Sequence, residues 1–387
     1  MILMEQLVSK ENLEKALKQI ERNKRKAPGI DGMRVEELRE YLSEHGEGIR
    51  QQLLSGTYEP QAVKRVEIPK DGGGLRLGRS QHQAVKETLK HVRDGKTWVV
   101  DMDLSKFFDR VNHDMLMARV ARQVEDKGIL RLVRRYLEAG VMIHGIVVET
   151  TVGTPQGDPL SPLLSNIILD DLDKELERRG HAFVRYADDF QAYVSSSRSG
   201  RRVMESLQKY VEGTLKLKVN QEKSSVRRIR KTTYLGFSFY KKPRGPISLR
   251  LASKTLQKVR RKFRELTTRR WSISIEDRIQ RINQYLKGWI GYFYPADMKT
   301  RLERIMGWLR RRLRMCLWKQ WKDPRTRLRK LRGLGVEDEE ARKVAGSRKG
   351  YWALSLNQQI HKALDNQYWS DAGLIQLIPT YSKYCRV

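Results

Sequence analysis

The sequence FVRYADDFQAY, residues 183–193, places two adjacent carboxylates between two runs of apolar and aromatic residues. Residues 183–187 alternate between two faces as in a β-strand, and apolar residues resume at Phe190. Asp188 and Asp189 are therefore predicted to lie at or near a hairpin turn. Two carboxylates on a tight turn repel each other unless a cation lies between them. The stretch predicts a divalent-metal site, and an ordinary acidic turn is the alternative.

A second acidic stretch lies upstream. WVVDMDLSKFFDRV, residues 98–111, is an apolar strand that ends in acids and continues into an aromatic pair. Asp101 and Asp103 fall on one face of that strand. Two sources of carboxylates that share two Mg²⁺ ions suit phosphoryl transfer, because one ion activates an attacking hydroxyl and the other stabilises a leaving pyrophosphate. Mg²⁺ takes few protein ligands, so two or three carboxylates suffice.

These motifs, in this order, resemble a known family. YADD at 186–189 and DLSKFF at 103–108 resemble the palm of a reverse transcriptase, and TPQGDPLSPLLSNIILDDLD at 154–173 resembles the template- and nucleotide-contacting segment between them. Over nearly its whole length the chain is similar to bacterial group II intron-encoded reverse transcriptase/maturases of class C, which lack an endonuclease domain. The resemblance implies an α+β fold. Its palm would be an antiparallel sheet backed by helices, with truncated fingers, a helical thumb and a small C-terminal DNA-binding domain.

The resemblance also assigns roles to single residues. It makes Asp103, Asp188 and Asp189 the catalytic residues and the ligands of two Mg²⁺ ions. Asp101 is the less suitable ligand, because in the family the aromatic gate follows the catalytic acid by five residues, as Phe108 follows Asp103. Phe108 would form the floor beneath the sugar 2′ position. The other implied nucleotide-binding residues are Lys70 and Arg76 in a glycine-rich hairpin, Gln156 and Gly157 in a turn, and Lys223, for which a solvated lysine is the alternative.

The resemblance divides the chain into four parts. In chain order these are an N-terminal extension with truncated fingers at 1–97, a palm at 98–240, a helical thumb/maturase domain at 241–321 and a C-terminal DNA-binding domain at 322–387. The fingers depart from the family, because Leu77-Gly78 continues directly into Arg79-Ser80. About forty residues that form a two-helix segment in the family are missing there. Their loss would expose apolar surface on neighbouring elements and weakens the expectation of polymerase activity.

The charge of the chain points to a polyanionic partner. The formal net charge is +32, from 78 Lys and Arg against 46 Asp and Glu, and roughly +23 of it lies between Lys241 and Gly350. Such an excess favours nucleic acid, and the arginine-rich helices of the thumb are expected to hold a template–primer duplex through its phosphates. The tryptophans of the same helices are predicted to lie in the core. Nucleic-acid contacts are predicted for Arg260, Arg261, Arg310, Arg311, Arg312, Arg314, Arg325 and Arg327.

Other classes of protein fit the sequence poorly. The two cysteines, Cys316 and Cys385, form no CxxC pair, which excludes a zinc site of cysteines and makes a disulfide framework improbable. No HNH-type cluster of Cys and His is present, so endonuclease activity is not expected. No apolar run approaches the ~20 residues of a membrane-spanning helix, and the N-terminal stretch is unlike a signal peptide. We expect the protein in the cytoplasm, bound to nucleic acid.

The predicted function is an RNA-directed DNA polymerase that is also a maturase, in which a primer 3′-hydroxyl attacks the α-phosphate of a dNTP. Its partners would be the group II intron RNA, a template RNA–primer duplex, target DNA and dNTPs, without a membrane. The truncated fingers favour a first alternative, a non-catalytic RNA-binding splicing maturase. A reverse transcriptase recruited to phage defence or repair is the second, and a membrane-surface protein is the most distant.

Overall fold

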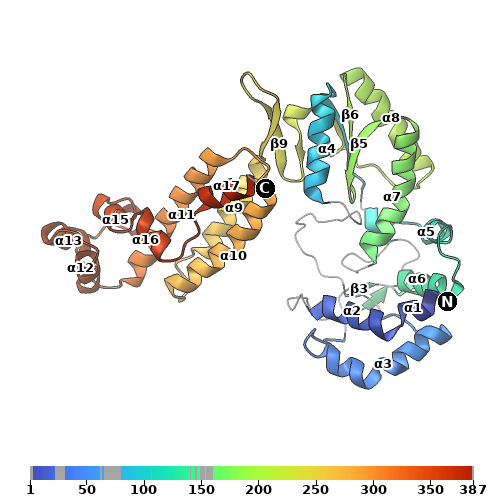
Figure 1. The fold of residues 1–387 in the computed structure, drawn as a ribbon, viewed down its shortest axis with the longest axis horizontal. Helices are drawn as coiled ribbons and strands as arrows, with labels where there is room; N and C mark the ends of the chain where they lie inside the picture. Colours follow the sequence, from blue (N-terminus) through green and yellow to red (C-terminus); the bar gives the residue numbers. More distant parts are fainter. Residues whose placement is uncertain are drawn as a thin grey trace. The chain divides into compact units, whose positions relative to one another are not determined.

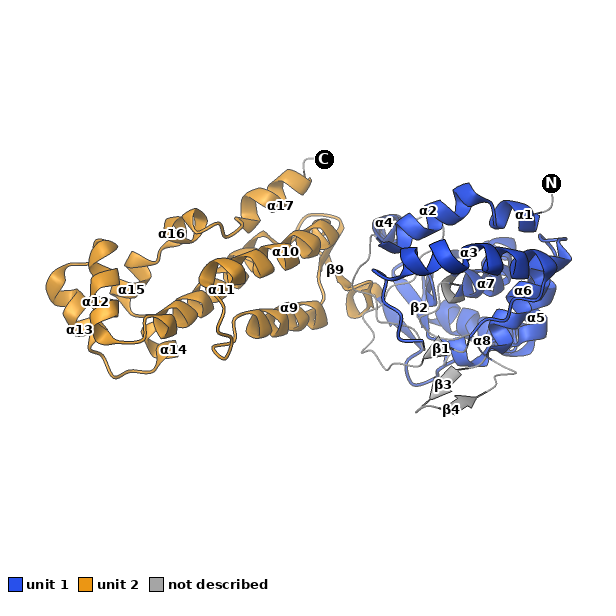
Figure 2. Cartoon of the chain, turned by 90° about the horizontal axis from the view of Figure 1, so that it is seen from below, with its two compact units in different colours: residues 1–228 blue, residues 229–387 orange. Residues whose placement is uncertain are grey.

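The structure is a computed structural model that forms two compact units, residues 1–228 and 229–387 (Figures 1 and 2). Each unit combines α-helices with antiparallel strands, so the predicted α+β class is confirmed. The structure describes residues 3–21, 31–61, 63–64, 80–105, 107–139, 141–143, 146–148, 153 and 160–385.

The centre of unit 1 is a four-stranded antiparallel sheet, which is the predicted palm sheet. Its strands, in spatial order, are β5 (Ala182–Tyr186), β6 (Asp189–Val194), β2 (Trp98–Met102) and β7 (Ser225–Arg228). Val100 lies opposite Ala192 on one side and Val226 on the other. The two acidic stretches of the sequence thus become neighbouring strands, although about eighty residues separate them in the chain.

Helices cover both faces of this sheet (Figure 1). One face packs on α7 (Ser161–Arg178) and α8 (Ser197–Gly213) through a core that includes Val100 and Phe190. Gly200 permits the close approach of α8, because a Cβ atom there would lie 2.5 Å from Cγ1 of Val226.

The opposite face packs on α4 (Gln81–Arg93). Ala84, Leu89 and Val92 lie roughly on one side of this helix, a spacing that predicts it from the sequence. Its first turn forms a capping box, in which the Ser80 hydroxyl accepts from the Gln83 amide and the Gln83 side chain accepts from the Ser80 amide. The hydroxyls of Thr88 and Tyr193 lie 2.8 Å apart and join the helix to β6. The predicted fingers hairpin and the shortened junction that follows it lie outside the described residues.

The rest of unit 1 consists of short helices and a small sheet. The strands β1 (Val63–Lys64), β3 (Val141–Ile143) and β4 (Ile146–Val148) form that sheet. The helices are α1 (Leu3–Leu7), α2 (Lys10–Glu21), α3 (Leu38–Ser55), α5 (His113–Val120) and α6 (Lys127–Glu138), with a 3₁₀ helix at Phe107–Arg110.

Unit 2 begins with a small antiparallel sheet of β8 (Thr233–Tyr234), β9 (Phe237–Lys241) and β10 (Ile247–Leu251). The alternating stretch 233–240 is therefore a tight hairpin and not one strand, because Leu235 and Gly236 turn the chain at φ +48° and +80°. The three helices predicted for the thumb are confirmed as α9 (Ser253–Leu266), α10 (Ile275–Phe293) and α11 (Lys299–Gln320).

Six short helices complete unit 2. They are α12 (Pro324–Gly333), α13 (Asp338–Ala345), α14 (Tyr351–Leu354), α15 (Gln358–Ala363), α16 (Asn366–Asp371) and α17 (Leu377–Cys385). Trp289, Trp318 and Trp321 are buried as predicted. Trp308, on α11, is only half-buried and so departs from the prediction. Trp271 lies between α9 and α10 and is 39% exposed. Among the described helices, none combines the length and the apolarity needed to cross a membrane.

Candidate active site

The predicted acidic turn is a two-residue hairpin connection. Tyr186, the last residue of β5, pairs with Asp189, the first residue of β6, so Ala187 and Asp188 form the turn itself. Ala187 has φ +56°, a left-handed conformation that is uncommon for a residue with a Cβ atom. The Asp188 side chain is half-buried and Asp189 is exposed. The turn therefore presents carboxylates to solvent in a conformation that the surrounding structure has to maintain.

Strand pairing brings Asp103 to the same end of the sheet. Met102 on β2 pairs with Phe190 on β6. Asp103 follows Met102 and Asp189 precedes Phe190, so in this antiparallel pair the two acidic residues are cross-strand neighbours. The three predicted catalytic acids thus share one end of the palm sheet.

Hydrogen bonds join the backbone of Asp103 to the turn that carries Lys223. The Asp103 amide donates to the Ser224 hydroxyl at 3.0 Å, and the Asn220 amide donates to the Asp103 carbonyl at 2.8 Å. The Lys223 amide donates to the Asn220 side chain at 3.3 Å, and the Lys223 side chain is exposed. The exposed ammonium of Lys223 therefore lies on a turn fixed beside the predicted catalytic acid.

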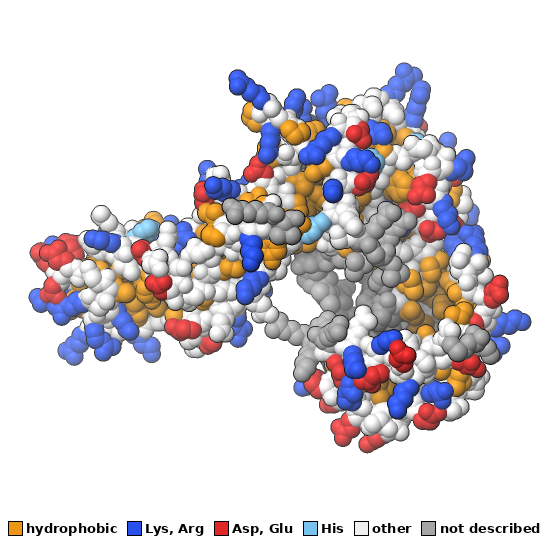
Figure 3. Space-filling model, viewed as in Figure 1, with side chains coloured by type: hydrophobic (Ala, Val, Ile, Leu, Met, Phe, Trp, Pro, Cys, Tyr) orange, Lys and Arg blue, Asp and Glu red, His pale blue; other side chains and the backbone are white. Residues whose placement is uncertain are grey.

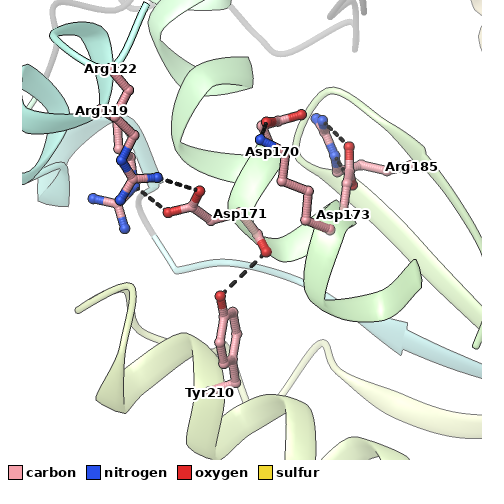
Figure 4. Close-up of polar contacts among 8 residues, drawn as sticks. Arg119, Arg122, Asp170, Asp171, Asp173, Arg185 and Tyr210 are labelled. Carbon is pink, nitrogen blue, oxygen red and sulfur yellow. Dashed lines mark hydrogen bonds and ion pairs between the residues drawn. The ribbon is translucent and has the colours of Figure 1, made fainter. Parts of the chain in front are cut away.

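The buried side chain of Arg185 connects helix α7 to the acidic turn, and Figure 4 shows its ion pair with Asp173. Arg185 and Asp173 form a two-pronged ion pair, with Nε donating to Oδ1 at 2.7 Å and Nη2 donating to Oδ2 at 2.6 Å. Their side chains are only 2% and 1% exposed. Nη1 of Arg185 donates to the Ala187 carbonyl and to the Asn166 side chain, both at 2.9 Å. The guanidinium thus links helix α7 to the left-handed residue of the turn.

Phe108 lies in the 3₁₀ helix that follows Asp103. Its ring makes an edge-to-face contact with Phe107, with ring centroids 5.2 Å apart, and it packs against the palm core. Gly153 fits against the same segment, because its φ is +102° and a Cβ atom there would lie 3.1 Å from the Phe108 carbonyl oxygen. The Gly153 amide donates to the Val111 carbonyl at 2.8 Å, and a ring nitrogen of buried His113 lies 2.6 Å from the Gly153 carbonyl.

Asp101 lies within β2 and contacts the neighbouring strand β6. Its carboxylate accepts a hydrogen bond of 3.2 Å from Gln191, whose side chain accepts from the Tyr193 hydroxyl at 3.0 Å. Burial raises the pKa of Asp101, and the hydrogen bond from Gln191 opposes that shift. The contacts of Asp101 agree with the preference for Asp103 as the ligand.

The side chains at this end of the sheet are of the kind that divalent cations bind. Carboxylate oxygens are the ligands that Mg²⁺ prefers, and Asp103, Asp188 and Asp189 bring them to adjacent strand ends. Within the described ranges, however, no three His, Cys, Asp or Glu side chains form a group that could hold a metal ion. The three carboxylates share a location without forming a coordination sphere.

Several predicted site residues cannot be compared with the structure. Lys70, Arg76, Gln156 and Gly157 lie outside the described residues. Conversely, sequence reasoning missed Arg185, Asp173 and Gly153. An arginine on the inward face of a predicted strand was the available signal, because a buried charge requires a partner.

The predicted nucleic-acid contacts fall into three groups by exposure. Arg260, Arg261 and Arg325 are exposed. Arg314 is 3% exposed and donates to the carbonyls of Ser355 and Leu364, so its guanidinium lies inside unit 2. The side chains of Arg310, Arg311, Arg312 and Arg327 are half-buried. Of these, Arg311, Arg312 and Arg327 donate hydrogen bonds to other residues of unit 2. Figure 3 shows Lys and Arg gathered at the end of the unit where α12 lies.

Two protein families match this chain. Residues 57–239 match the family described as reverse transcriptase (RNA-dependent DNA polymerase), and residues 256–334 match the group II intron, maturase-specific domain. The chain therefore carries a reverse transcriptase region followed by a group II intron maturase-specific region, in the predicted order.

Known proteins resemble parts of this chain in sequence. The chain is 28% identical to Protein YkfC of Escherichia coli K12 over 328 positions, covering 65% of this chain and 86% of that protein. It is 31% identical to the group II intron-encoded protein LtrA of Lactococcus lactis subsp. cremoris over 163 positions, covering 33% of this chain and 27% of LtrA. Among solved structures, the partial Cas6-RT-Cas1–Cas2 complex is 23% identical over 55% of this chain and 43% of that chain, with a TM-score of 0.34. A score this low carries no argument.

Proposed function

We propose that DNA synthesis takes place at the end of the palm sheet where Asp103, Asp188 and Asp189 meet. The cross-strand neighbourhood of Asp103 and Asp189 is the observation that carries this proposal. These three residues would hold two Mg²⁺ ions, which supply charge neutralisation at the reacting phosphate and lower the pKa of the attacking hydroxyl. Phe108 would support the sugar of the incoming nucleotide, and the exposed ammonium of Lys223 would stabilise the charge of the departing pyrophosphate.

A cleavage experiment tests this assignment without requiring activity. With Fe²⁺ in place of Mg²⁺, plus ascorbate and peroxide, hydroxyl radicals should cut the backbone near residues 103 and 188. Asp188→Asn should remove both cuts, whereas Asp170→Asn should not, because Asp170 pairs with Lys174 on helix α7. Cuts that persist in Asp188→Asn would contradict the assignment.

For unit 2 we propose that helices α9 to α11 of the maturase-specific region bind the parent intron RNA and that α12 binds target DNA. The first proposal rests on the family match over residues 256–334 and the second on the exposed basic side chains of α12. Affinity for intron RNA should fall in a chain that has Arg260 and Arg261 replaced by glutamine, while affinity for target DNA stays unchanged.

Splicing without DNA synthesis is the second candidate function, and the shortened fingers, where Leu77-Gly78 continues directly into Arg79-Ser80, favour it. Splicing and primer extension should be measured side by side for wild type and Asp188→Ala. Splicing by both proteins, with extension by neither, would select this candidate.

A further inference from the structure

Unit 2 contains a groove that the active site does not use. It encloses about 720 Å³ between the end of α9, the middle of α11 and the start of α14. Its basic lining consists of Arg264, Arg269, Arg270, Arg312 and Lys319, and no acidic residue lines it. None of these five side chains forms an ion pair with a carboxylate anywhere in the described part of the chain. Like charges gathered without counter-charges favour an anionic occupant.

Contacts inside the protein orient two of these cations. The Lys319 ammonium donates to the Arg269 carbonyl at 2.8 Å. The Arg312 guanidinium donates to the Thr267 carbonyl at 3.3 Å. Burial lowers the pKa of Arg312, and the positive charges of Arg264 and Arg269 lower it further. The cations therefore come from two helices and the loop after α9 and line one groove.

Aromatic rings alternate with these cations. Guanidinium carbons of Arg264 and Arg312 lie 5.9 and 5.4 Å from the centre of the Trp308 ring. Arg269 lies 5.5 Å from the centre of the Tyr351 ring. Trp352 is 39% exposed, and Arg311 lies 3.7 Å from the centre of its ring. Exposed aromatic faces beside arginines stack unpaired bases, whereas the bases of a duplex are already stacked on one another.

We propose that this groove binds an unpaired segment of RNA, with phosphates on the arginines and at least one base on Trp352. The inference deepens the proposed RNA binding of unit 2 and rests on it. The exposed arginines of α9 can bind a duplex through its phosphates alone. Binding in the groove differs because it requires unpaired bases that are free to stack.

Binding of labelled RNA to the full chain, in EDTA and without dNTPs, tests the proposal independently of catalysis. Trp352→Ala should weaken binding of an unpaired oligonucleotide about ten-fold and leave binding of duplex RNA unchanged. Trp271→Ala is the matched control, because Trp271 is also 39% exposed but does not line the groove. Equal losses for single strand and duplex, or no loss beyond the control, would overturn the proposal.

A charge variant tests the phosphate contacts. Replacing Arg264 and Arg269 by glutamine should lower the slope of log affinity against log salt by about 1.4 for unpaired RNA. The control replaces Arg342 and Lys343, which pair with acidic residues of α13. An unchanged slope would contradict the proposal. If single-stranded DNA loses as much affinity as RNA in these variants, the assignment to RNA is wrong.

Discussion

At the scale of single residues, the active site depends on a side chain that takes no part in the chemistry. Arg185 donates hydrogen bonds to the Asp173 carboxylate, the Asn166 side chain and the Ala187 carbonyl. The side chains of Arg185 and Asp173 are buried. The left-handed conformation of Ala187 costs free energy, and Arg185 on β5 connects that residue to helix α7 through its hydrogen bonds. Arg185 is therefore a positioning residue for Asp188.

Arg185→Gln should lower the free energy of unfolding by about 3–5 kcal/mol, because it leaves Asp173 buried without its partner. Replacing both residues by leucine should recover most of that stability. The rate of nucleotide addition should nevertheless stay about a hundred-fold low, because the turn is no longer fixed. Urea unfolding and single-turnover primer extension at saturating dNTP measure the two effects.

Helix α7 offers a matched control for this experiment. Arg119 donates to Asp171 at 2.7 Å from another face of the helix (Figure 4). Arg119→Gln should reduce stability and leave the rate of addition unchanged. A leucine pair at Arg185 and Asp173 that extends primers at the wild-type rate would show that the arginine has only a structural role.

Gly153→Ala should disturb the support of Phe108. We expect a loss of about 1–3 kcal/mol in stability from the left-handed backbone, and weaker discrimination between dNTPs and rNTPs because the new Cβ presses on the Phe108 carbonyl. Gly180→Ala is the control, since Gly180 has φ +67° and a Cβ atom there would have nothing within 4 Å. Both variants should lose stability. The measurement is the ratio of kcat/KM for dNTPs to kcat/KM for rNTPs. If Gly153→Ala keeps the wild-type ratio, Gly153 does not support Phe108 in this discrimination.

At the scale of elements, helices could be predicted from the sequence and contacts between elements could not. Apolar side chains at helical spacing sufficed for α4, α9, α10 and α11. Residues 233–240 alternate like a strand, and the alternation continues through Leu235 and Gly236, where the structure turns the chain. The ion pair of Arg185 and Asp173 joins a strand to a helix, and no local pattern records which buried charges meet. The prediction that Asp103, Asp188 and Asp189 share one site came from the family resemblance.

The start of α4 is an element whose stability can be measured. Ser80→Ala should lower the free energy of unfolding by about 1 kcal/mol, because it removes the oxygen that accepts from the Gln83 amide. Ser80→Asp keeps an acceptor and should retain most of the stability. Equal losses in the two variants, measured by urea unfolding, would show that the capping box is not what fixes the helix start.

At the scale of the whole molecule, charge separates binding from catalysis. The net charge of +32 predicts that RNA affinity falls steeply with salt, by about a thousand-fold between 50 and 200 mM if six phosphates are contacted. Asp188→Ala should show the same salt slope as wild type, because phosphate contacts lie elsewhere. Fluorescence anisotropy with a labelled RNA measures this slope. A clearly different slope in the variant would mean that the acidic turn contributes to RNA binding.

Primer extension on an RNA template, with Mg²⁺ and dNTPs, tests the central claim most directly. The wild-type chain should extend the primer, and Asp188→Ala should give no product while it binds the same RNA with similar affinity. This result would also show that the shortened fingers still allow synthesis. Extension by Asp188→Ala at the wild-type rate would contradict the active site proposed at the end of the palm sheet. Absence of product from both proteins, with RNA binding retained, would contradict polymerase function and leave splicing as the function of the chain.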